Sequence, residues 1–258
     1  MYKRQVEANA TYTYFLKYVP TAYVKHFIQD KSATFKAIYS EMSKKPLYLH
    51  LATEGYDGPS LKAYDKTFSP WRLFNSIHLG ELKTTKLVFL SACYSLQNYN
   101  EGNYYDNFGY VLVNIAGAKY VIGSRGRIDT IAAAVFAMEF YDAYFAGDDN
   151  VRYDVRIAFG YALAQTKSKL KSMIDLFLEP ITDTLLGRLV GILKEKLKTY
   201  EFVFEEIVDL AKKIFMDYSS EALTDAVFSL SNLYIYDGSY STGIGGGGNG
   251  GGTHPVII

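Results

Sequence analysis

The sequence contains a single cysteine, Cys93, among its 258 residues. One cysteine cannot form an intramolecular disulfide, and it cannot supply a cysteine-rich metal site. Histidine is also scarce, and the four histidines lack the spacing of metal ligands. We therefore predict neither a bound metal nor a cofactor. The histidines are His26, His50, His78 and His254.

An excess of charge and long apolar runs are absent as well. The 27 basic residues balance the 27 acidic residues, so nothing in the charge indicates a nucleic-acid partner. No apolar run reaches the roughly 18 residues of a membrane span, and no signal peptide is visible. We therefore expect a cytoplasmic protein without a membrane partner, long enough to bury one sizeable core.

Both ends of the chain differ from the rest. The opening MYKRQ (1–5) matches the translation of a common sequencing-library adapter, read from a GTG start. This match predicts that residues 1–5 are artefactual and that an upstream domain has been lost. Residues 241–258 are rich in glycine, which predicts a flexible tail because glycine loses the most chain entropy on ordering. We expect residues 6–240 to form one domain.

Strands and helices alternate along the first two thirds of the chain. Apolar runs predict strands over 11–19, 46–53, 87–93 and 118–124, the last three of them buried. Amphipathic spacing predicts helices over 32–45, 106–117, 129–147 and 151–173. Alternation of this kind produces right-handed βαβ units. The sequence therefore predicts an α/β fold, a three-layer α/β/α sandwich around a mostly parallel sheet.

Local signals mark the ends of these elements. Ser32, Asp106 and Asp129 are predicted N-caps, because their side-chain oxygens can accept hydrogen bonds from free helical N–H groups. Residues 55–70 are rich in turn formers and are predicted to be a loop. Residues 174–229 carry leucine stripes at helical spacing, which predicts a helical insertion. It would be a lid, a partner surface or a dimer contact, unless its leucine stripes belong to the core. Residues 232–239 return to a strand, with a turn at Asp237-Gly238.

Polar residues follow three of the predicted strands. Glu54 and Gly55 follow the first buried strand, Cys93 ends the second, and the segment GSRGRID (123–129) ends the third. In open parallel sheets, ligands bind beyond the carboxyl ends of the strands. Cys93 is therefore a candidate nucleophile. The alternative is that Cys93 is a small buried apolar residue.

Residues 31–166 resemble the CHAT domain, a caspase-like module of the caspase and gingipain superfamily that often lies beside tetratricopeptide repeats. The resemblance is carried by ATFKAIYSEMSKKPLYLHLATEG, by the strand TKLVFLSACYS and by AGAKYVIGSRGRID, in the family's order and spacing. It also extends to FYDAYFAG and AFGYALAQTK. It implies an α/β/α sandwich. Active members of the family are cysteine peptidases with a histidine–cysteine dyad.

The chain departs from the family at one catalytic position. The family's catalytic histidine aligns with Glu54, whereas His50 matches an earlier, structural histidine. A glutamate is ionised at pH 7 because its ordinary pKa is about 4.3. It would repel a thiolate, and it has no proton for a leaving amine. His50 is a weak substitute, since it lies roughly 13 Å back along the strand at about 3.3 Å per residue. His78 is predicted to be a surface residue.

Several residues are predicted to bind substrate: Gly55, Ser124, Arg125, Arg127 and Asp129. Asp129 is either a helix cap or a pocket acid that selects a basic residue, and both roles are compatible. Arg125 and Arg127 would instead select an acidic group, unless they are solvated loop charges. Glu54 is a solvated loop residue, a polar contact in an inactive site, or a charge that sets selectivity.

Two functions remain open from the sequence. The first is a cysteine endopeptidase in which Cys93 is the nucleophile and the base is non-standard. The second is a pseudopeptidase that binds a peptide or a partner protein without cleaving it. We favour the second because the catalytic histidine is replaced. A nucleotide-binding domain is disfavoured, because the strand–loop segments lack phosphate-binding glycine motifs.

Overall fold

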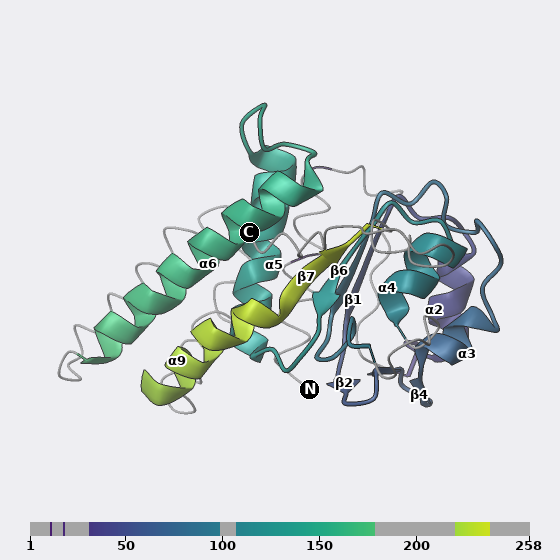
Figure 1. Cartoon of the computed structure of the whole chain (residues 1–258), viewed down its shortest axis with the longest axis horizontal. Coiled ribbons are helices and arrows are strands. Elements are labelled where there is room, and N and C mark those ends of the chain that lie inside the picture. The colour runs from purple at the N-terminus through teal and green to yellow at the C-terminus, as the bar shows by residue number, and fades with distance from the viewer. Residues whose placement is uncertain (1–10, 12–17, 19–30, 99–106, 179–219, 238–258) are drawn as a thin grey trace, which may run out of the picture.

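A mixed sheet forms the centre of the molecule (Figure 1). The computed structural model describes residues 31–98, 107–178 and 220–237, together with Thr11 and Tyr18. Within these residues the main sheet has four strands in the order β1-β5-β6-β7. They are β1 (Tyr48–Ala52), β5 (Leu87–Ser91), β6 (Tyr120–Ser124) and β7 (Leu233–Tyr236). The first three are parallel, and β7 pairs antiparallel with β6.

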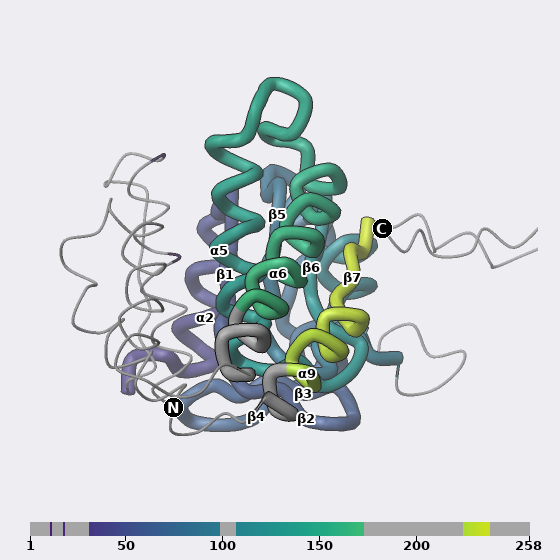
Figure 2. The backbone as a smooth tube through the Cα atoms, turned by 90° about the vertical axis from the view of Figure 1, so that its left-hand side faces the viewer, coloured from purple at the N-terminus to yellow at the C-terminus, as the bar shows by residue number. Residues whose placement is uncertain are grey.

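Helices cover both faces of this sheet (Figures 1 and 2). One face packs against α5 (Thr130–Ala146), α6 (Val155–Leu178) and α9 (Ser220–Ser229), and the short helix η5 (Leu230–Asn232) joins α9 to β7. The other face carries α2 (Phe35–Met42), α3 (Pro70–Phe74) and α4 (Phe108–Tyr110), which continues as the π-helical turn η3 (Val111–Ile115). The predicted α/β/α sandwich is therefore confirmed.

Strand β5 divides the core into two halves. Its five residues are all buried, as the continuous apolar run predicts for a central parallel strand. Phe89 faces the aromatic side chains of α5, whereas Val88 and Leu90 face the helices on the other side. Strand β1, by contrast, is only half-buried along its length. The prediction of a buried strand there was wrong, because β1 lies at the edge of the described sheet.

The observed N-caps agree only in part with the predicted ones. Asp129 caps α5 as predicted, and Gly147 follows the last helical residue. Ser32 does not cap α2, because Thr34 takes that position and its Oγ1 accepts from the N–H of Ala37. Asp106 lies outside the described residues, and the neighbouring Asn107 caps α4. Helix α6 begins at Val155 rather than at 151, after Asp154 accepts from two N–H groups.

The predicted loop at 55–70 contains a second, small sheet. It consists of β2 (Gly55–Tyr56), β3 (Ser60–Lys62) and β4 (Thr67–Phe68), paired antiparallel in that order. The prediction of a loop there was wrong, because strands of two or three residues carry no recognisable period. Figure 1 shows this sheet beyond the end of β1. It lies where the carboxyl ends of the parallel strands meet.

Some predictions fall on parts of the chain outside the described residues. This holds for most of the predicted strand at 11–19, although the two described positions, Thr11 and Tyr18, are helical. It holds for residues 179–219 of the predicted insertion, whose flanks belong to α6 and α9. It also holds for residues 1–5, for the glycine-rich tail and for Gly238 in the predicted turn.

Candidate functional site

Cys93 lies two residues beyond the end of β5 and is half-buried. Its thiol contacts one residue twice: the S–H donates to the Ile128 carbonyl at 3.5 Å, and the Ile128 N–H donates to Sγ at 3.4 Å. The chain turns sharply at the next residue, Tyr94, whose φ is +56°. A left-handed tyrosine is uncommon, and its N–H is held by the carbonyl of Gly126 at 2.9 Å. The fold thus holds the thiol against the segment that follows β6.

Glu54 and Gly55 lie beside Cys93. The N–H of Thr53 donates to the Ser91 carbonyl at 3.1 Å, which extends the pairing of β1 with β5. At Gly55 the backbone passes so close to Cys93 that an added Cβ would lie 1.8 Å from the Cys93 carbonyl oxygen. Only glycine fits this approach. The structure therefore brings the ends of β1 and β5 together, as expected for neighbouring parallel strands.

The Glu54 carboxylate is engaged by the small sheet. Its Oε2 accepts from the Tyr56 hydroxyl at 2.9 Å and from Nζ of Lys62 at 3.1 Å. These two hydrogen bonds, that of Lys62 first, lower the pKa of the Glu54 carboxyl below its ordinary range. Lys62 lies on β3, which pairs with β2. The hairpin thus supplies the groups that bind the Glu54 carboxylate.

The Glu54 ion pair makes a pH-dependent contribution to stability. Because its pKa is lower in the folded state than in the unfolded state, this contribution is present above the ordinary pKa of about 4.5 and is lost as pH falls through the folded-state value. Both side chains are 47% exposed, so solvent screening keeps this contribution small. We expect Glu54→Gln to lower the free energy of unfolding at pH 7. In urea titrations the loss should shrink as the pH falls below the ordinary glutamate pKa, and a loss that is the same at pH 7 and in acid would contradict the assignment.

His50 belongs to the core rather than to the site. It lies on β1, its Nδ1 is 2.9 Å from the Tyr141 hydroxyl on α5, and its ring packs on Phe89 with centroids 4.8 Å apart. His78 is exposed in a segment near the amino ends of the strands, where the N–H of Gly80 donates to Ile115. The structure therefore brings neither histidine to Cys93. His26 and His254 lie outside the described residues.

The segment after β6 supplies the third side of the site. Ser124 is buried, and its N–H donates to Oγ of Ser95 at 3.0 Å, which ties the segment to the chain after Cys93. Asn232 fixes the next residues: its carbonyl accepts from the Arg125 N–H and its Nδ2 donates to the Arg127 carbonyl, both at 2.8 Å. The side chains of Arg125 and Arg127 are exposed. We name Glu54, Gly55, Cys93 and residues 124–129 together the strand-end site.

Asp129 ends this segment and begins α5. Its Oδ1 accepts from the N–H of Ile131 at 2.8 Å and from that of Ala132 at 3.2 Å. Capping of this kind satisfies helical N–H groups and opposes the positive end of the helix dipole. The carboxylate is thus directed at the helix, as the first of its two predicted roles requires.

We expect Asp129→Ala to lower the free energy of unfolding by about 1 kcal/mol, because two helical N–H groups lose their acceptor. Asp129→Asn should recover most of that loss, since asparagine caps nearly as well. Urea denaturation measures both. If Asp129→Ala were as stable as the unsubstituted protein, the cap would contribute nothing to stability, and the result would favour the pocket-acid role.

Comparison with known proteins shows the family of the chain. The family model of the CHAT domain matches residues 6–152, which is more than half of the chain. The chain belongs to the CHAT-domain family. The match begins earlier and ends earlier than the resemblance at 31–166, and it includes Glu54, Cys93 and Asp129 of the strand-end site. No curated protein sequence matches the chain.

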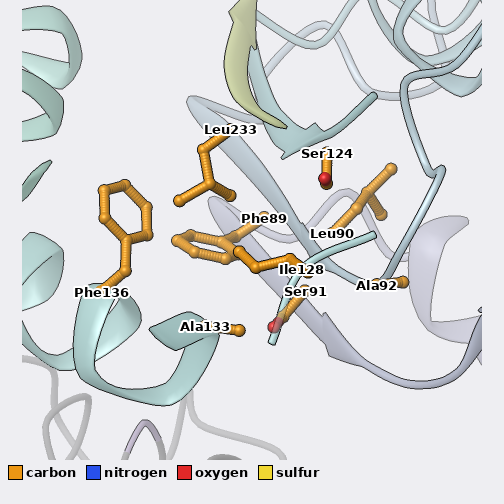
Figure 3. A pocket seen from close by; sticks show the side chains of 9 residues that line it. All are labelled: Phe89, Leu90, Ser91, Ala92, Ser124, Ile128, Ala133, Phe136 and Leu233. Carbon is orange, nitrogen blue, oxygen red and sulfur yellow. The ribbon is translucent and has the colours of Figure 1, made fainter. Parts of the chain in front are cut away.

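A narrow gap lies beneath the strand-end site of this CHAT domain (Figure 3). It is enclosed between the end of β5, the start of α5 and β7, and it does not admit a water-sized sphere. In Figure 3 the rings of Phe89 and Phe136 face each other across it, and Ile128 covers it from the side of the segment after β6. The gap itself therefore has no room for a ligand.

Two features are absent from the described part of the CHAT domain. Among these residues no group of three or more metal-ligating side chains is close enough to hold an ion. No described helix is long and apolar enough to cross a membrane.

Several residues of the site were not predicted from the sequence. Tyr56 and Lys62 lie in the segment predicted as a loop, so their contact with Glu54 had no detectable pattern. Asn232 contacts the segment after β6 across more than one hundred residues of chain. Ile128 acts through its backbone, which has the same groups in every residue except proline.

Proposed function

We propose that this CHAT-domain protein is a pseudopeptidase, which binds a peptide or a partner protein across the strand-end site without cleaving it. One observation carries the proposal. Cys93 and Glu54 follow neighbouring strands, and the hydrogen bonds of each side chain go to other residues: Cys93 bonds to Ile128, and Glu54 bonds to Lys62 and Tyr56. Neither residue is bonded to a group that could accept the thiol proton and later donate it to a leaving amine.

The chemistry of peptide cleavage explains why this matters. A cysteine peptidase needs a base that takes the thiol proton and later returns it to the leaving amine. A lysine-bound carboxylate with a lowered pKa is a poor proton donor at neutral pH. A backbone carbonyl can accept a hydrogen bond but cannot carry the proton through a reaction cycle. The strand-end site of the described residues is therefore equipped for binding rather than for hydrolysis.

A second function is favoured by one contact. The Ile128 N–H points at Sγ, and a hydrogen bond to sulfur stabilises its anionic form. A thiolate stabilised in this way would be the nucleophile of an active cysteine endopeptidase whose base is not Glu54. Cys93 would attack the peptide carbonyl, and the unidentified base would protonate the departing amine.

The pH dependence of thiol alkylation separates the two functions. We expect the ratio of the rates at which iodoacetamide labels Cys93 and N-acetylcysteine to stay the same from pH 6 to pH 9, because a site that only binds needs no activated nucleophile. The chain has one cysteine, so the incorporated mass reports this site alone. Rapid labelling that is already complete at pH 6 would instead support the endopeptidase. Denatured protein provides the control for accessibility.

A further inference from the structure

The two arginines of the strand-end site are its uncompensated charges. Among the described residues, neither Arg125 nor Arg127 has a carboxylate within ion-pair distance, although both side chains are exposed. The acidic groups of the site are already committed. Glu54 is bound by Lys62, and Asp129 accepts from the N–H groups at the start of α5. The site therefore presents positive charge to any ligand.

Arg127 is adjacent in sequence to the residue that contacts the thiol. The N–H of Ile128 lies 3.4 Å from Sγ. From the backbone geometry, the Cα of Arg127 is then at most about 6 Å from the sulfur. An arginine side chain spans a similar length, so its guanidinium can reach a group on a ligand that lies beside Cys93.

The fold orders the segment that carries Arg127 before a ligand arrives. The guanidinium of Arg125 lies 4.1 Å above the ring of Tyr234 on β7, a cation–π contact on the side of the sheet opposite the Cys93 thiol. The Arg127 carbonyl accepts from Asn232. At Gly126, between the two arginines, an added Cβ would lie 2.8 Å from the Asn232 side chain. This packing reduces the entropy lost when the segment binds a partner.

From these contacts we infer that the strand-end site binds a peptide segment with an acidic side chain, whose carboxylate is bound by Arg127. A guanidinium binds a carboxylate through two parallel N–H groups, which makes arginine more selective for this ligand than lysine. This inference rests on the proposed function and names its ligand class. It uses Asp129 as the helix cap and not as a group that selects a basic residue.

Reactive peptides test the inference at Cys93 itself. The probes are Ala-Ala-X vinyl sulfones in which X is aspartate, asparagine or lysine, and methyl vinyl sulfone is the reagent without a peptide. In each case the Cys93 thiol releases its proton to water and the sulfur adds to the vinyl carbon β to the sulfone: a C–S bond forms, the C=C π bond breaks, and the carbon beside the sulfone takes a proton from water. Rates are measured by intact mass and divided by the rates with N-acetylcysteine.

We expect the aspartate probe to label the protein about threefold faster than the asparagine probe, as an exposed charge pair allows. Arg127→Gln should abolish that preference, and Arg127→Glu should make the lysine probe the faster one. Lys36→Glu on α2 is the matched control, since this exposed lysine lies on the opposite side of the sheet from the Cys93 thiol. It should leave the preference unchanged, whereas about 0.5 M salt should weaken it.

The failures of the two proposals differ. If all three peptide probes label Cys93 faster than methyl vinyl sulfone does, and at equal rates, the result supports peptide binding and overturns the acidic preference. If no peptide probe labels Cys93 faster than methyl vinyl sulfone does, the proposed function is overturned as well. A preference that survives Arg127→Glu would overturn the assignment to Arg127.

Discussion

Replacing Glu54 by histidine is expected to raise the hydrolysis of fluorescein-labelled casein at pH 7.5 by about 100-fold or more. Position 54 precedes the glycine whose backbone approaches that of Cys93, and it is the position at which the family's catalytic histidine aligns. It would take the thiol proton and return it to the leaving amine, which a lysine-bound carboxylate cannot do. The measurement is the release of fluorescent peptides with time.

Two variants control this experiment. Glu54→Gln removes the charge without supplying a base, and it should remain inactive. Glu54→His combined with Cys93→Ala retains the imidazole without the nucleophile, and any activity left in it would come from a contaminant. A folded Glu54→His variant with no gain in hydrolysis would mean that the family's catalytic geometry is lost beyond this one residue.

Gly55→Ala is expected to lower the free energy of unfolding by about 3 kcal/mol. The added methyl group would lie 1.8 Å from the Cys93 carbonyl oxygen and 2.8 Å from its carbonyl carbon. Backbone atoms cannot rotate away as a side chain can, so the ends of β1 and β5 must separate. Urea denaturation measures the loss, which is a large part of the stability of a typical domain.

Gly80→Ala is the matched control for this substitution. Gly80 has a φ of +71° and no heavy atom within 4 Å of an added Cβ. Its replacement should cost about 1 kcal/mol, through left-handed strain alone. If the Gly55 and Gly80 variants were equally destabilised, the close approach of Gly55 to Cys93 would not be the cause.

The layers of the fold were predictable because their signals are local. The continuous apolar run at Leu87–Ser91 predicts a buried parallel strand, and the structure buries all five residues. The carboxylate of Asp129 and the glycine at 147 mark both ends of α5 by short-range chemistry. The family match over 6–152 then agrees with the fold that this alternation of elements predicts.

The errors arose where local chemistry was ambiguous or pairing was distant. Ser32 and Thr34 both carry a hydroxyl that can cap a helix, and only the backbone conformation at Thr34 decided between them. The strands of the small sheet are too short to show a period of two. Their pairing, which brings Lys62 to Glu54, joins residues eight apart across a hairpin.

The sequence by itself determined the order of the main-sheet strands and of the long helices α5 and α6, and the identity of the residues that follow the parallel strands. It did so because apolar periodicity and capping act over a few residues. Only the tertiary structure decided which atoms those residues touch: Glu54 contacts Lys62, His50 contacts Tyr141, and Cys93 contacts the backbone of Ile128. His50 and Cys93 meet partners 91 and 35 residues away. Contacts of such range depend on how the whole chain packs, and no local pattern encodes them.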